Sequence, residues 1–278
     1  MSISDLNEPL KDVIRSIVWC SGEPLVVSSE VVELLFNHLR FCCTSIVNRL
    51  PNNQPSLNDL LNVVRYDTQK LARIFDYFQI LSGSQDPKYN GDDCVEVKSD
   101  LVSHVNTEPD VSRVSALCTQ LGIPLPVSII STASRLRTPF LQGRRLRLAR
   151  IDQKFARLSV EDYITFTRVR QSATLLVFIR NNQRLAFWRW VFLQSKHSTE
   201  FALNDCSNLT SRNPLARPEV REFIRVLAHL LTGEILDVVD LTLFYRRKLG
   251  IDLQTPITPV EVNQTLRLMS KHFPHKNF

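Results

Sequence analysis

Hydrophobic residues recur at helical spacing along much of the chain, and the longest such pattern runs from Pro218 to Leu249. Pro218 suits the first turn of a helix, and Gly250 provides a stop after the last turn. Acidic residues near the start and basic residues at 246–248 both complement the helix dipole. A helix of this length spans roughly 45 Å. Its apolar residues form more than one stripe, so we expect other elements to pack against it on several sides.

The order short helix, long helix, short helix is predicted twice. In the N-terminal part, the apolar spacing predicts a short helix at 10–20, a long helix at about 30–50 and a short helix at 57–64, followed by one extra helix. In the C-terminal part, a short helix at 182–193 precedes the long helix, and another short helix follows Thr258. This order is the layout of a histone fold, in which a long central helix is crossed by a short helix at each end.

A single histone fold exposes too much apolar surface to be stable alone, so it needs a second copy to cover its open face. We therefore predict an all-α protein in which two tandem histone folds form an intramolecular pair. The N-terminal histone fold is expected at residues 1–82, a linker at 83–157, and the C-terminal histone fold with a preceding block at 158–278. Within that block, residues 161–169 and 172–179 suit either strands or buried helices, and their periodicity does not decide between the two.

The net charge of +6 is unevenly distributed along the chain. Residues 1–100 hold 9 basic and 14 acidic side chains, whereas residues 135–190 hold 13 basic and 3 acidic ones. A localised positive field of this kind favours acidic partners or nucleic acid. The six cysteines include no C-x-x-C pair, which indicates reduced thiols in a nuclear or cytosolic protein. Charged residues interrupt the longest helix, so we expect a soluble protein without a membrane span.

Several segments resemble a known family. Residues 59–73 contain DLL and RYDTQKLAR, which look like the D-L-L/F…R-x-D-x-x-K-L-x-R signature of the TFIID factor thirteen and Spt-three histone folds. The residues CSGE at 20–23 occupy the place of the F-G-D turn in those proteins. Further similarity to the Spt-three family lies in Tyr163, RQSA at 170–173, FW at 187–188 and VVDL at 238–241.

This resemblance implies a nuclear, non-enzymatic scaffold subunit of the SAGA transcriptional coactivator, acting in transcription initiation through paired histone folds. It also implies two kinds of partner: TATA-binding protein, which such a subunit helps to deliver to promoters, and other SAGA subunits with histone folds. In Spt-three proteins an acidic position of the second histone fold matters for TATA-binding protein, so we expect Glu234, together with Asp237, to contact it. A histone-like DNA-binding protein, a TFIID-type histone-fold factor and an unrelated helical adaptor remain as alternatives.

The acidic residues of the long helix do not indicate catalysis. Glu234, Asp237 and Asp240 stand at i, i+3 and i+6, a spacing that favours a solvated or partner-facing stripe. His38 and Cys42 stand at i and i+4, as two metal ligands could, but no further ligand follows at a suitable spacing, so we interpret them as a partly exposed imidazole and a core thiol. Because motifs for phosphate, nucleophile or zinc-protease sites are absent, no catalytic residue, metal, cofactor or small-molecule substrate is predicted.

Direct binding of DNA by the Arg-rich segment at 135–150 is a separate hypothesis. It rests on the strong binding of phosphate by arginine. It would be favoured by a DNA affinity that falls steeply with salt. The alternatives are pairing with acidic residues elsewhere in the chain, such as the N-terminal region, or a nuclear-import signal. Trp188 and Trp190 could stack on bases or pack on the core. The basic segment concerned consists of Arg135, Arg137, Arg144, Arg145, Arg147 and Arg150.

Overall fold

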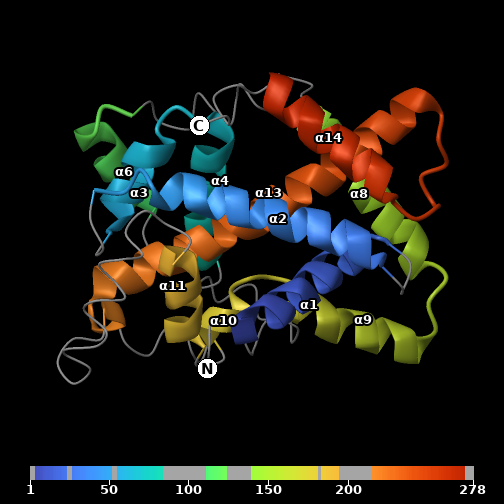
Figure 1. Cartoon of the computed structure of the whole chain (residues 1–278), viewed down its shortest axis with the longest axis horizontal. Helices are drawn as coiled ribbons and strands as arrows, with labels where there is room; N and C mark the ends of the chain where they lie inside the picture. Colours follow the sequence, from blue (N-terminus) through green and yellow to red (C-terminus); the bar gives the residue numbers. More distant parts are fainter. Residues whose placement is uncertain are drawn as a thin grey trace.

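The computed structural model describes residues 4–23, 27–51, 55–83, 111–123, 139–180, 183–193 and 214–272, and every regular element within these ranges is helical (Figure 1). The prediction of an all-α protein is thereby confirmed. The helices are α1 (Ser4–Cys20), α2 (Ser29–Val47), α3 (Leu57–Val64), α4 (Thr68–Gly83), α6 (Val111–Gln120), α8 (Pro139–Phe155), α9 (Val160–Ser172), α10 (Val177–Arg180), α11 (Arg184–Leu193), the short 3-10 helix η3 (Pro214–Ala216), α13 (Pro218–Leu249) and α14 (Pro259–His272).

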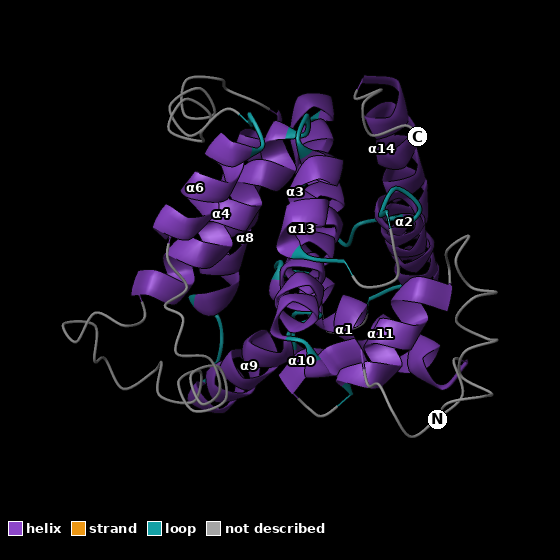
Figure 2. Cartoon of the chain, turned by 90° about the vertical axis from the view of Figure 1, so that its left-hand side faces the viewer, coloured by secondary structure: helices purple, strands orange, loops and turns teal. Residues whose placement is uncertain are grey.

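Helix α13 is the central element of the fold. It runs behind α2 in Figure 1, and Figure 2 shows it between α4, α6 and α8 on one side and α2 and α14 on the other. Its ends agree with the sequence prediction, because Pro218 begins the helix and Gly250 ends it in the left-handed conformation, with φ of 70°. Helices α1, α2, α3, α4, α8 and α14 all contact it, which explains why apolar residues surround so much of its circumference.

The N-terminal helices agree with the predicted order, with one change in length. Helix α1 begins at Ser4, earlier than the apolar spacing indicated, because Leu6 also turns into the core and is 1% exposed. Helix α3 begins with a capping box: the Ser56 side chain accepts from the backbone of Asp59, whose carboxylate accepts from the backbone of Ser56. These helices therefore follow from local sequence signals as well as from burial.

The block before the long helix is helical, which settles an ambiguity of the sequence. Residues 161–169 lie in α9 and most of 172–179 lies in a turn and in α10. Trp188 and Trp190 on α11 are 0% exposed, and the Trp190 indole N–H donates to Asn7 Oδ1 at 3.2 Å. Both rings therefore belong to the hydrophobic core, and neither is placed to stack on a base.

Helix α8 lies within the region that the sequence assigned to a linker. It makes the most extensive helix contact with α13, and Gly143 allows the two backbones to approach closely. A Cβ atom on Gly143 would lie 3.0 Å from the Cα of Asp240 and would overlap its carbonyl group. Part of the basic segment is thereby held against the core. Within the described residues, no helix is both long enough and apolar enough to cross a membrane.

Candidate functional site

Three carboxylates of α13 form a buried row of charges. Glu234, Asp237 and Asp240, which we call the acidic row, are 2%, 2% and 4% exposed. Their spacing of three residues places them on one face of the helix. The expectation of a solvated or partner-facing stripe is therefore wrong. Buried carboxylates require cations and hydrogen-bond donors beside them, and neighbouring helices supply these.

Each member of the acidic row has its own basic partner. On α4, Lys70 Nζ lies 3.1 Å from Glu234 Oε1, and Arg73 forms an ion pair with Asp237. On α8, Arg147 binds Asp240 with two hydrogen bonds, of 2.6 Å and 3.3 Å. The row thus links α4 and α8 to α13 through charge pairs removed from water.

Local sequence explains how α4 reaches the row. Asp67 caps α4, because its carboxylate accepts from the backbone N–H of Lys70 at 3.1 Å. It also binds Lys70 Nζ at 2.6 Å, so the lysine is shared between Asp67 and Glu234. The carboxylates raise the pKa of Lys70, even though burial acts in the opposite direction. Gly233 leaves room for Arg73, since a Cβ there would overlap the guanidinium group.

The basic segment divides between internal and exposed arginines. Arg147 binds Asp240, and Arg150, 2% exposed, binds Glu23. Both therefore pair with acidic residues elsewhere in the chain, which was one of the alternatives to DNA binding. Arg144 and Arg145 are exposed on α8. The remaining two, Arg135 and Arg137, lie outside the described residues.

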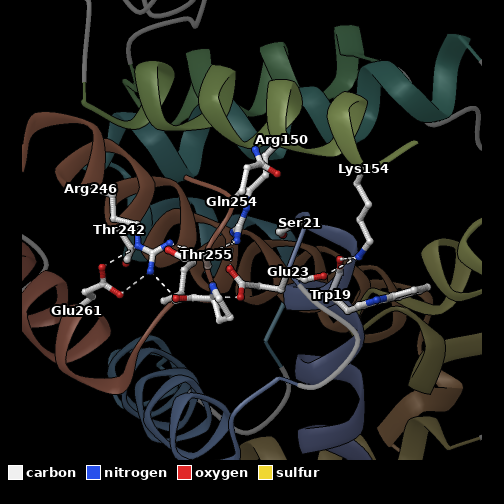
Figure 3. Close-up of polar contacts among 12 residues, drawn as sticks. Trp19, Ser21, Glu23, Arg150, Lys154, Thr242, Arg246, Gln254, Thr255 and Glu261 are labelled. Atoms are coloured by element: carbon white, nitrogen blue, oxygen red, sulfur yellow. Dashed lines mark hydrogen bonds and ion pairs between the residues drawn. The ribbon is translucent and has the colours of Figure 1, made fainter. Parts of the chain in front are cut away.

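The loop after α1 meets the loop after α13 around a further buried ion pair, that of Arg150 and Glu23 (Figure 3). Glu23 accepts from Arg150 and, at 3.0 Å, from the backbone N–H of Ile257. Arg150 also donates to the carbonyl of Thr255 at 2.9 Å. Lys154 completes the junction by donating to the Glu23 carbonyl at 2.6 Å. Two loops more than 200 positions apart are thus fixed to each other and to α8.

Arg246 organises the loop between α13 and α14. Its guanidinium binds Glu261 on α14 and the carbonyls of Thr255 and Pro256 (Figure 3). The distances are 2.7 Å to Glu261 Oε1 and 2.6 Å to the Thr255 carbonyl oxygen. A single buried side chain therefore sets the turn that presents Thr255 to Arg150.

A pocket of about 550 Å³ adjoins one end of the acidic row. The exposed rings of Phe41 and Tyr66 belong to its wall, and Glu234 and Lys70 supply charge. Helices α2, α3, α4, α13 and α14 all contribute. The lining residues are Leu34, Asn37, His38, Phe41, Cys42, Ser45, Ile46, Arg49, Val63, Val64, Tyr66, Asp67, Lys70, Glu234, Leu266, Met269 and Ser270.

Within this pocket, Glu234 joins the His38 and Cys42 pair that the sequence had singled out. The Cys42 sulfur lies 3.5 Å from His38 Nε2 and 3.8 Å from Glu234 Oε2. His38 Nε2 lies 4.0 Å from the same carboxylate oxygen. Sequence reasoning missed the third group because it stands 192 positions after Cys42, and only the crossing of α2 and α13 brings it near.

Burial shifts the pKa of two groups on α13, His229 and Asp240. His229 packs against Tyr77, with ring centroids 5.1 Å apart, and burial together with the charge of Arg73 lowers its pKa from 6.5 to about 4. Burial raises the pKa of Asp240 to about 6, although Arg147 acts to lower it. At neutral pH, His229 is therefore uncharged and Asp240 is ionised.

His229 is expected to make the fold sensitive to acid. Its pKa is lower in the folded chain than in the unfolded one, so the unfolded chain binds more protons between about pH 6.5 and pH 4. The contribution of His229 to stability is present above pH 6.5 and is lost as the pH falls to about 4. Replacing His229 by Gln should remove a pH-dependent part of the unfolding free energy of about 3 kcal/mol.

Urea unfolding of the wild type and of His229→Gln at pH 7 and pH 4 measures the pH-dependent contribution of His229 to the unfolding free energy, as the difference between the two proteins. The raised pKa of Asp240 has the opposite effect, because its contribution is lost as the pH rises through about 6. That effect is common to both proteins and cancels in the difference. An identical pH dependence in the two would contradict the assignment.

Comparison of the chain with protein-family models, with curated proteins and with solved structures gives no match.

Proposed function

We propose that the chain is a non-enzymatic scaffold subunit of a SAGA-type transcription coactivator, built on an intramolecular pair of histone folds and engaging TATA-binding protein in the nucleus. In this proposal α1, α2 and α3 form the first histone fold, which α4 extends as the extra helix, and α11, α13 and α14 form the second. The two long helices α2 and α13 contact each other, and α14 also contacts α2. Such crossing of central helices is what a pair of histone folds requires.

One observation carries the proposal: the residues that resemble the family signature lie between the two helix sets. Asp67, Lys70 and Arg73 belong to the R-x-D-x-x-K-L-x-R match. Lys70 and Arg73 bind Glu234 and Asp237 on the long helix of the second set. The signature thus has a physical meaning in this chain, since its charged positions join one set to the other across a buried interface.

The turn that resembles F-G-D supports the same reading. Gly22 has φ of 96°, which favours glycine, and it directs Glu23 toward Arg150 and Ile257. Ile257 lies in the loop before α14. The first loop of one helix set therefore meets the last loop of the other, as expected when two short–long–short units pair with opposite orientation.

In this proposal Glu234 and Asp237 are not direct contacts with TATA-binding protein. Both carboxylates are 2% exposed and bind cations of α4, so a partner would first have to displace Lys70 or Arg73. Charge reversal at either position would leave like or unpaired charges inside the protein. The resulting loss of stability would obscure any effect on binding. We therefore assign these residues to the interface between the two helix sets.

Binding of TATA-binding protein tests the functional proposal. The purified chain of 278 residues is expected to form a one-to-one complex with a dissociation constant of about 1 μM or tighter. Isothermal titration calorimetry measures the dissociation constant. The titration is done at low and at high salt, because an association due only to surface charge weakens strongly as salt rises. Nuclease treatment of both proteins excludes bridging by DNA. Absence of a complex at concentrations of about 10 μM would contradict the proposal.

A further inference from the structure

A nitrogen, a sulfur and an oxygen ligand converge where α2 crosses α13. We propose that His38, Cys42 and Glu234 form a binding site for a divalent transition metal, with Zn²⁺ as the preferred ion. Their ligand atoms all lie within 4.8 Å of one another. His38 and Cys42 are one helical turn apart on α2, so both project from the same face, and Glu234 approaches from α13. This site is independent of the proposed function.

The distances fit a tetrahedral ion. With Zn–N and Zn–O bonds of about 2.0 Å and a Zn–S bond of about 2.3 Å, ligand atoms at tetrahedral angles are separated by about 3.3–3.6 Å. The separations in this structure are 3.5 Å from Cys42 Sγ to His38 Nε2, 3.8 Å from Cys42 Sγ to Glu234 Oε2, and 4.0 Å between His38 Nε2 and Glu234 Oε2. A movement of a few tenths of an ångström by each side chain closes the site.

The surrounding charges also suit a dication. Lys70 Nζ binds Glu234 Oε1, which leaves Oε2, the oxygen that faces Cys42 and His38, as the metal ligand. Lys70 then acts as the outer partner that orients a ligating carboxylate. With Cys42 as thiolate, the charges of Zn²⁺, Cys42, Glu234, Lys70 and Asp67 add to zero. Imidazole, thiolate and carboxylate are all ligand types that Zn²⁺ accepts.

The fourth coordination position opens toward the pocket. His38, Cys42 and Glu234 all line the cavity of about 550 Å³, whose walls include the apolar side chains of Ile46 and Met269. Three protein ligands with one open position leave room for water or for a donor atom of an entering ligand. The same metal ion would join α2 to α13, and so would link the two helix sets that the proposed function pairs.

Metal titration of the whole chain of 278 residues tests the site. After removal of metals with a chelator, the wild type should bind one Zn²⁺ per chain, and Zn²⁺ should raise its melting temperature. Co²⁺ in place of Zn²⁺ should give the visible bands of a tetrahedral ion and a thiolate charge-transfer band. In Cys42→Ser the charge-transfer band should be absent. Loss of an outer-shell partner typically lowers metal affinity by about 10- to 100-fold, and loss of the ligand Cys42 should lower the zinc affinity by at least as much.

The adjacent Cys43 provides a matched control. It is 0% exposed, its sulfur faces the carbonyl of Val191, and burial raises its pKa to about 12, so it does not reach the site. Cys43→Ala should keep the zinc affinity, the cobalt spectrum and the melting shift of the wild type. Because Glu234→Gln also weakens a buried ion pair, Cys42→Ser and His38→Asn are the decisive variants. Equal zinc binding by wild type and Cys42→Ser, or no stoichiometric uptake by the wild type, would overturn the proposal.

Discussion

Replacing Arg150 by methionine is expected to reduce the unfolding free energy by about 3–5 kcal/mol, the usual cost of leaving one member of a buried ion pair alone. The Arg150 side chain is 1% exposed and that of Glu23 is 3% exposed. Without the guanidinium, Glu23 keeps the Ile257 N–H but loses its charged partner, and Thr255 loses a donor. Urea unfolding followed by circular dichroism measures the loss.

Two further variants separate the ion pair from general effects of the substitution. Arg144→Met changes an exposed arginine of the same helix, so its effect should stay within about 0.5 kcal/mol. The double variant Glu23→Met with Arg150→Met replaces both charges by apolar groups and should recover much of the stability. A single variant Arg150→Met as stable as Arg144→Met would show that the junction of the two loops contributes nothing to the fold.

Gly143→Ala is expected to cost about 3 kcal/mol, the upper end of the range for overpacking. Alanine normally favours a helix over glycine, so intrinsic propensity predicts a gain in stability. In this chain the added Cβ would overlap the carbonyl of Asp240, and α8 would have to move away from α13. That movement would also strain the hydrogen bonds between Arg147 and Asp240. Thermal and urea unfolding both measure the effect.

Gly122→Ala is the matched control for this substitution. A Cβ on Gly122 meets nothing within 4 Å, and only its φ of 63° opposes a side chain. Its cost should therefore be about 1 kcal/mol, from backbone conformation alone. If Gly143→Ala stabilised the protein, the close approach of α8 to α13 would be wrong.

The sequence predicts the helices better than it predicts what their charged residues do. Pro218 and Gly250 mark both ends of α13 because helix termini depend on local signals. The sequence favours a solvated or partner-facing stripe for the acidic row, because acidic residues at helical spacing usually face water or a partner. Its burial depends on Lys70, Arg73 and Arg147, whose approach is a matter of tertiary packing.

The proposed metal ligands show the same limit more clearly. His38 and Cys42 are visible as a pair at i and i+4, but a search for further ligands nearby in sequence cannot find Glu234. Residues 172–179 are a related case, because a short apolar run suits a strand as well as a buried helix. In each case the missing information is which elements lie beside one another, and periodicity within one element does not contain it.

The central claim is that two sets of helices cover each other's apolar faces within one chain, and its most direct test is to separate them. Residues 1–123 and 139–278, expressed as two chains, retain all the described helices. We predict that neither is soluble and cooperatively folded alone, and that together they form a one-to-one helical complex in size-exclusion chromatography. Two pieces that fold independently and do not associate would contradict the account.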